Sequence, residues 1–119
     1  MTTVTIDSRG PVHEITIKGH ACYDLTGHDI VCSACSMLTY TLASSVTAME
    51  EAGAVQAMTV ELNAGDAYIR AVANENLHDS ARLQAIIDTI RTGFQLLANK
   101  YPMNVQIVPA GGETSPKAE

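Results

Sequence analysis

The chain has 119 residues, of which 46% are hydrophobic, so it can form one domain with its own core but not a second one. Its formal net charge is −6, with seven Lys and Arg against thirteen Asp and Glu, which argues against direct nucleic-acid binding and favours a basic partner. No uninterrupted apolar run approaches the roughly 18 residues of a membrane span, and residues 1–10 lack the features of a signal peptide. A cytoplasmic location with reduced thiols and no membrane contact is therefore expected.

The first two predicted elements are strands at residues 4–7 and 13–18, where apolar and polar residues alternate. The turn-forming residues 8–11 (SRGP) lie between the two strands and indicate a hairpin. Residues 20–28 show no sustained period and are predicted to form a loop.

A long helix is predicted at residues 30–51, with Asp29 as its N-cap and Gly53 just beyond its end. Between Met37 and Met49 it contains no charged residue, and apolar side chains cover nearly its whole circumference. A helix that is apolar all round is buried on all sides. Either the sheet wraps around this helix or one of its faces meets a second copy of the chain, and the sequence leaves both alternatives open.

Two further strands are predicted at residues 57–63 and 66–73, joined by a tight turn. A second helix follows, capped by Asp79 or Ser80, and residues 105–108 form a last strand. The buried face of this helix is predicted from the spacing of its apolar residues, which are Leu83, Ile86, Ile87, Ile90, Phe94 and Leu97.

The order of these elements is ββαββαβ, which predicts an α+β fold, a largely antiparallel sheet with two helices packed on it. Residues 1–109 are predicted to form this single domain. Residues 110–119 lack apolar side chains beyond Pro and Ala and are expected to be a disordered tail.

The predicted loop and the start of the first helix carry an unusual group of side chains. It consists of His20, Cys22, His28, Cys32 and Cys35. Zinc favours such ligands, and a Cys-x-x-Cys pair is a common half-site. A structural zinc site normally needs a second close-set pair, whereas the remaining ligands here are a His-x-Cys pair and one single His, so the spacing disfavours zinc.

Cys32 and Cys35 lie three residues apart on the predicted helix and therefore share a face, as a redox-active dithiol would. A thioredoxin-like dithiol follows a strand directly, within a βαβ pattern, and faces a proline at the start of another strand. Neither feature occurs here. Cys35 is more simply explained as a small buried helix residue.

Cys32 alone has the surroundings of a nucleophile, because it lies in the first turn of the long helix. The helix dipole and free backbone N–H groups favour a thiolate there, and the same N–H groups could bind an oxyanion. An imidazole that accepts the thiol proton would complete a catalytic pair. His20 and His28 are both candidates, and spacing alone does not choose between them.

The stretch from Gly19 to Ser36 resembles the signature of the ribosomal-processing cysteine proteases. Their pattern is Gly-His, a short loop, and then Gly-x-Asp-Ile-Val-Cys-Ala followed closely by Ser. This chain has Gly-His at residues 19–20, GHDIVCS at residues 27–33, and Ser36 four residues after Cys32. Ser33 replaces the usual Ala, and the length and element order also fit the family.

The resemblance implies that Cys32 is the nucleophile and His20 the general base, with Gly19, Asp29 and Ser36 in supporting positions. It implies an endopeptidase that removes the N-terminal extension of bacterial large-subunit ribosomal protein twenty-seven after aromatic residues. It also implies a homodimer without a metal or organic cofactor.

Met37 and Tyr40 lie close to Cys32 in the sequence and are candidates for the wall of an apolar substrate pocket. The main rival function is a non-enzymatic, ribosome-associated binding protein, which would not need the thiol. A small dithiol redox or zinc-binding domain is the remaining alternative.

Overall fold

The computed structural model describes residues 1–25 and 28–109, so Gly27 of the motif and the expected tail at residues 110–119 lie outside the described residues. The elements follow one another in the predicted order, which confirms the α+β fold class. Their bounds are β1 Thr2–Arg9, β2 Val12–Lys18, α1 Ile30–Glu51, β3 Val55–Asn63, β4 Asp66–Ala73, α2 Leu77–Lys100 and β5 Val105–Pro109.

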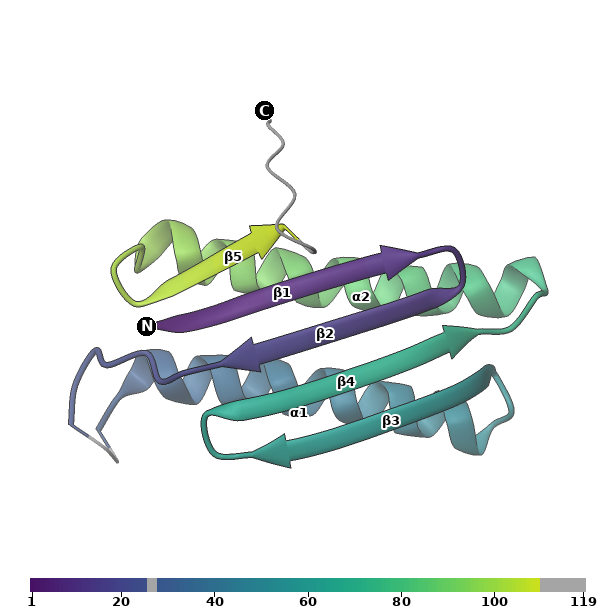
Figure 1. Ribbon diagram of the computed structural model, residues 1–119, viewed down its shortest axis with the longest axis horizontal. Coiled ribbons are helices and arrows are strands. Elements are labelled where there is room, and N and C mark those ends of the chain that lie inside the picture. The colour runs from purple at the N-terminus through teal and green to yellow at the C-terminus, as the bar shows by residue number, and fades with distance from the viewer. Residues whose placement is uncertain (26–27, 110–119) are drawn as a thin grey trace.

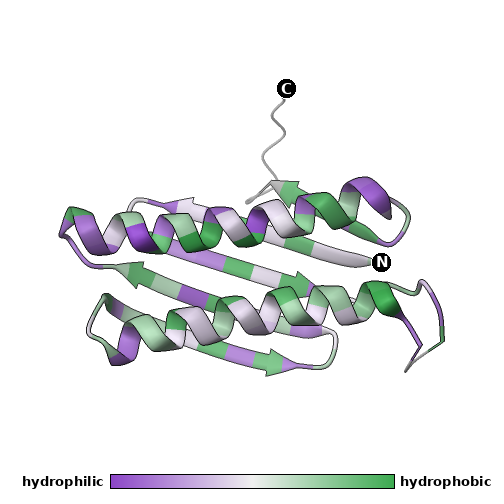
Figure 2. Ribbon diagram, turned by 180° about the vertical axis from the view of Figure 1, so that it is seen from behind, coloured by the Kyte–Doolittle hydropathy of each residue, from purple (hydrophilic) through white to green (hydrophobic). Residues whose placement is uncertain are grey.

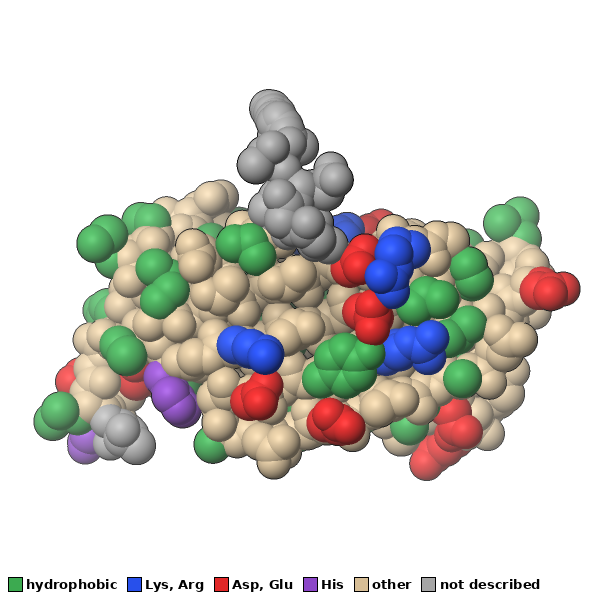
Figure 3. All heavy atoms as spheres, in the orientation of Figure 1, with side chains coloured by type: hydrophobic (Ala, Val, Ile, Leu, Met, Phe, Trp, Pro, Cys, Tyr) green, Lys and Arg blue, Asp and Glu red, His purple; other side chains and the backbone are tan. Residues whose placement is uncertain are grey.

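One five-stranded sheet organises the fold, with the strand order β3-β4-β2-β1-β5. Neighbouring strands are antiparallel except for β1 and β5, which are parallel. Figure 1 shows both helices behind the sheet, and Figure 2 shows from behind that they lie side by side across it. The sheet therefore has one face covered by helices and one open face, on which charged side chains are visible (Figure 3).

The hydrophobic core lies between the inner face of the sheet and the two helices. Alternate residues of the central strands point into it, and the side chains of Val4, Ile15 and Ile69 are at most 1% exposed. The helices contribute the largest buried side chains on their side of the core, which are Val31, Leu42, Val46, Met49, Leu83, Ile87 and Phe94.

Helix α2 begins at Leu77, earlier than predicted, and neither Asp79 nor Ser80 caps it. Asn76 is the N-cap, because its side-chain oxygen accepts a hydrogen bond from the N–H of Asp79. The Asn76 amide in turn donates to the Asp79 carboxylate, so Asp79 is the third helical residue of a reciprocal capping pair. The prediction chose the wrong member of this pair.

Helix α1 begins and ends where predicted, but it is not buried on all sides. Val31, Leu42 and Val46 lie against the sheet and α2, whereas Met37 is 64% exposed and Tyr40 is 53% exposed. The sheet does not wrap around the helix, because both helices cover the same face. Of the two alternatives left open by the sequence, the one in which the sheet wraps around the helix is therefore wrong.

Among the described residues, α1 is the one helix whose length and mean hydropathy would suffice to cross a membrane. This corrects the expectation that no stretch of the chain approaches a membrane span. In this fold one face of α1 packs on the sheet, as expected for the core helix of a globular domain.

Candidate active site

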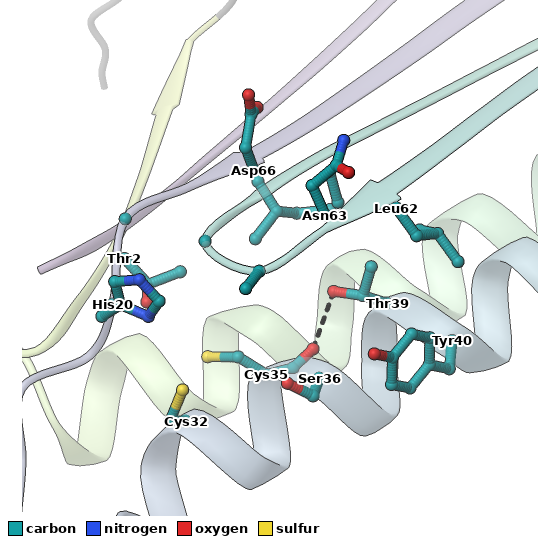
Figure 4. A pocket seen from close by; sticks show the side chains of 15 residues that line it. Thr2, His20, Cys32, Cys35, Ser36, Thr39, Tyr40, Leu62, Asn63 and Asp66 are labelled. Carbon is teal, nitrogen blue, oxygen red and sulfur yellow. Dashed lines mark hydrogen bonds between the residues drawn. The ribbon is translucent and has the colours of Figure 1, made fainter. Parts of the chain in front are cut away.

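The end of β2, the N-terminal half of α1 and the β3–β4 turn enclose a cavity of about 80 Å³ that His20 and Cys32 both line. Figure 4 shows the imidazole and the thiol on the same side of this cavity. The same two residues also line a larger cleft of about 410 Å³ beside α1. Among the described residues, His28 lines neither space, so His20 is the imidazole that shares a cavity with Cys32.

His20 is held at the end of β2 by backbone contacts that require glycine at the preceding position. Gly19 has φ +94°, and a Cβ there would lie 2.2 Å from the carbonyl oxygen of Met1. The Gly19 N–H donates to the carbonyl of Gly65 at 2.8 Å, and the Met1 nitrogen donates to the carbonyl of His20. The chain therefore turns sharply at Gly19 and presents the imidazole to the cavity.

Gly65, in the β3–β4 turn, is a site residue that the sequence analysis missed. Its φ is +70°, and a Cβ built on it would lie 2.6 Å from Nε2 of His20. The pairing of β2 with β4, which sets Lys18 opposite Asp66, brings this turn to the end of β2. The sequence NAGD signals a turn, but the strand order is needed to show that its glycine lies against the imidazole.

Asp29 caps α1 as predicted and also ties the preceding loop to the helix. Its Oδ1 accepts from the N–H of Cys32 at 2.8 Å. Its Oδ2 accepts from the N–H groups of Tyr23 at 2.8 Å and Asp24 at 3.3 Å. Burial acts to raise the pKa of Asp29, but the backbone N–H groups, that of Cys32 foremost, outweigh burial and lower it. The Asp29 carboxylate therefore holds the loop backbone at Tyr23 and Asp24 to the first turn of α1, which carries Cys32.

The first turn of α1 offers fewer oxyanion donors than expected. The N–H of Cys32 donates to the Asp29 carboxylate, and the N–H of Ser33 donates to the Asp29 carbonyl at 3.1 Å. These two groups are therefore engaged, so neither is free to bind an oxyanion in this structure.

Cys35 is buried, as expected, whereas Cys32 is only half-buried. Burial, followed by the neighbouring Cys32, raises the pKa of the Cys35 thiol to about 11, so it stays protonated at neutral pH. A buried thiol with so little thiolate at neutral pH is a weak nucleophile, which fits a core residue of α1. Among the described residues, no group of three or more His, Cys, Asp or Glu side chains is arranged to hold a metal ion.

The remaining predicted residues lie along α1 and its approach. Ser36 and Tyr40 line both the cavity and the larger cleft, whereas Met37 lines the cleft alone. Cys22, on the loop, also lines the cleft, and it has φ +57°, a conformation rarely adopted by a residue other than glycine. The predicted site residues therefore line either the cavity or the adjoining cleft, except for His28, and the cleft has the strained Cys22 in its lining.

The raised pKa of Cys35 predicts a loss of stability at alkaline pH. The unfolded chain releases this proton near pKa 9.0, whereas the folded chain holds it up to about 11. Between these values the folded state binds more protons, so the free energy of unfolding should fall as pH rises, by on the order of 2 kcal/mol. Urea unfolding at the two ends of this range measures the loss. The Cys35→Ala variant should lack this component, and an equal loss in both proteins would contradict the assignment.

A half-buried thiol and an imidazole line one cleft of about 410 Å³ on this fold, an arrangement that suits a cysteine protease. The profile of the family described as cysteine protease Prp matches residues 1–106. The chain belongs to this family, and the predicted enzyme class is confirmed.

Individual relatives agree with this assignment. The ribosomal processing cysteine protease Prp of Staphylococcus aureus is 26% identical over 104 residues, which cover 87% of this chain and 92% of the relative. The crystal structure of the S. aureus protease Prp with a covalently linked product peptide is 28% identical, with a TM-score of 0.69 over 92% of this chain and 99% of that one. The crystal structure of SMU.848 from Streptococcus mutans, 24% identical with a TM-score of 0.62 over 92% and 93% of the two chains, shares the fold.

Proposed function

We propose that this protease removes the N-terminal extension of bacterial large-subunit ribosomal protein twenty-seven, cutting after aromatic residues. The observation that carries the proposal is the cleft that Cys32 and His20 share. The S. aureus relative is named a ribosomal processing protease, and its crystal structure holds a covalently linked product peptide, which is consistent with nucleophilic catalysis.

Cys32 and His20 form the proposed catalytic dyad. The Cys32 sulfur attacks the carbonyl carbon of the scissile bond, while His20 accepts the thiol proton. The tetrahedral intermediate expels the amine, which takes that proton from His20 and leaves a thioester on Cys32. A water molecule then gives a proton to His20 and attacks the thioester, which releases the acid and restores the thiol.

The neighbouring residues have supporting roles in this proposal. Gly19 turns the chain so that the imidazole enters the cavity, and Asp29 fixes the start of α1 beneath the thiol. Ser36 lies one turn after the nucleophile and lines the same cleft, where it has a supporting role in this proposal. Met37 and Tyr40 form the proposed wall against which aromatic substrate side chains pack.

The charge of the chain suits this substrate. A net charge of −6 attracts a basic ribosomal protein, so the association rate should fall as salt is added. The proposed partner is thus a protein and not nucleic acid, and the proposed location is the cytoplasm, where that protein is made.

The proposal is tested with two synthetic peptides that differ only at the cleavage position. One carries the N-terminal extension with its aromatic pair, and the other has alanines in place of that pair. Mass spectrometry of the products should show cleavage directly after the aromatic pair and much slower cleavage of the alanine peptide. Tight binding of the first peptide without any cleavage would instead favour the non-enzymatic, ribosome-associated role.

The proposed homodimer uses the side of α1 that faces α2, which Tyr40 does not line. An apolar groove of about 400 Å³ lies between α1 and α2, and Met37 and Leu96, at its border, are 64% and 65% exposed. Light scattering at micromolar concentration should give twice the subunit mass, because such a surface is costly to leave in water. The Leu96→Lys variant should shift the mass toward one subunit. A subunit mass for the unmodified protein would contradict the prediction.

A further inference from the structure

Strand β3 forms one edge of the sheet, and in the part of the chain that the structure describes it pairs with β4 alone. It is nine residues long and contains no Pro, Lys or Arg, and Glu61 is its only charged residue. Natural proteins usually protect such an edge with these residues or with a short strand. The opposite edge follows that rule, because β5 has five residues and ends in Pro109.

The backbone groups that face this open edge can be assigned from the hairpin. A two-residue turn joins the paired residues Asn63 and Asp66. Residues that flank such a turn exchange both of their backbone hydrogen bonds, and the pattern then alternates along the strand. The N–H and C=O groups of Leu62, Val60 and Met58 therefore point away from β4, toward the open edge.

The same three residues carry the apolar side chains of the edge strand. They lie opposite Ala67, Ile69 and Ala71, which are buried on the inner face of the sheet. Met58 and Val60 are only half-buried, and Leu62 is 40% exposed. The inner face of the sheet thus extends past the helix that covers it and leaves an apolar strip beside the unpaired backbone.

This edge leads directly into the catalytic site. Leu62 and Asn63 line the cavity that contains His20 and Cys32, and Tyr40 of α1 lines it opposite them. Figure 4 shows Leu62 near Tyr40 at the end of the cavity away from the imidazole. A polypeptide that leaves the cleft past Tyr40 therefore meets the end of β3.

The charge around this edge is acidic. Glu61 lies on β3, and Glu50 and Glu51 end α1 shortly before β3 begins. Red side chains gather along the lower border of Figure 3, where β3 lies. No basic residue in the last turn of α1 offsets Glu50 and Glu51, although a helix C-terminus favours cations. A basic segment would complement this charge.

We propose that the edge of β3 binds an extended, basic segment of the substrate, next to the scissile bond, as a sixth strand of the sheet. The backbone groups of Met58, Val60 and Leu62 supply hydrogen bonds that do not depend on sequence, and the apolar strip receives every second side chain. A segment that pairs with the whole of β3 has nine residues, as β3 does, at roughly 3.3 Å each. This inference rests on the proposed function, because it assumes that an extended ribosomal segment is the substrate.

Hydrogen exchange tests the proposal without altering the edge. The Cys32→Ala protein is measured alone and with a synthetic peptide that carries the N-terminal extension, the aromatic cleavage position and a following segment made basic with lysines. The amides of Met58, Val60 and Leu62 should exchange more slowly with the peptide, whereas those of Thr59 and Glu61, already paired with β4, should change little. Unchanged exchange at the first three amides with the peptide bound would overturn the inference.

Variants provide a second readout through cleavage kinetics. Val60→Pro removes one outward N–H, and an edge strand can accept proline at such a position. It should lower kcat/KM for the long peptide about fivefold to tenfold more than for a short peptide that fills only the cleft, as expected for one lost hydrogen bond. Val60→Ala, the matched control, keeps the N–H and should not show this difference. Equal losses for the long and short peptides with Val60→Pro would count against the inference.

The possible failures are distinguishable. If the enzyme cleaves neither peptide, the proposed function fails. If it cleaves both equally well, and Val60→Pro does not separate them, only the edge-strand inference fails. If the outward amides are protected in the free protein, and more so at higher protein concentration, the edge belongs to a second copy of the chain and the inference is wrong.

Discussion

The Cys32→Ala variant is expected to bind the substrate segment and leave it uncut. Removal of a nucleophile that acts together with its base lowers kcat by on the order of 10⁴-fold to 10⁶-fold, because the acyl-enzyme route is closed. Cys32→Ser should behave in the same way, since an imidazole that activates a thiol is too weak a base for the much less acidic hydroxyl in the same position. Rates of product formation and peptide affinity, measured separately, distinguish lost chemistry from lost binding.

The matched control is Cys35→Ala, which removes the other thiol of the same helix face. Cys35 is buried, and its raised pKa keeps it protonated, so most of the cleavage rate should remain. Full cleavage by Cys32→Ala together with loss of cleavage by Cys35→Ala would reverse the assignment of the nucleophile. Thermal melting of both variants checks that neither result reflects unfolding.

Gly65→Ala is expected to lower kcat by on the order of 100-fold while the protein stays folded, because small misplacements of a catalytic group have effects of this size. The new Cβ would lie 2.6 Å from Nε2 of His20, so the imidazole must move. The left-handed backbone at this position adds about 1–2 kcal/mol of strain for a residue with a side chain.

Gly53→Ala separates the displacement of the imidazole from the backbone strain. Gly53 has φ +71°, nearly the same as the +70° of Gly65, but a Cβ there would meet no atom within 4 Å. Both variants should therefore lose a similar amount of stability, measured by urea unfolding, and only Gly65→Ala should lose activity. A similar loss of activity in both variants would show that the contact with His20 is unimportant.

Local patterns in the sequence predicted much of this fold. Strand β4 and helix α1 have the predicted bounds, because alternation, a capping Asp29 and the terminal Gly53 are all local signals. The start of α2 was misplaced because Asn76 and Asp79 can each act as a cap, and their reciprocal hydrogen bonds decide between them. The bounds of two strands were also missed, since β1 extends two residues beyond the predicted 4–7 at each end and β3 begins two residues before the predicted residue 57.

The candidate site shows which features local sequence patterns cannot predict. The motif identified Cys32 and Asp29 because they are neighbours in the sequence, and the resemblance selected His20 over His28. Gly65 could not be found in this way, since it is far from His20 along the chain and reaches it only through the pairing of β2 with β4. The exposed face of α1 was also unpredictable, because hydropathy does not reveal how far a sheet extends around a helix.

The parallel pairing of β1 with β5 affects when a newly made chain can act. Thr2 lies opposite Val105, so the first strand gains its outer neighbour only after the last strand has been synthesised. His20 likewise gains its contact with Gly65 only after the β3–β4 turn has been made. Since translation delivers the N-terminal part of a domain first, an unfinished chain carries Cys32 and His20 without the parts that hold them in place. We therefore expect an unfinished chain to lack activity until the β3–β4 turn and β5 have been made.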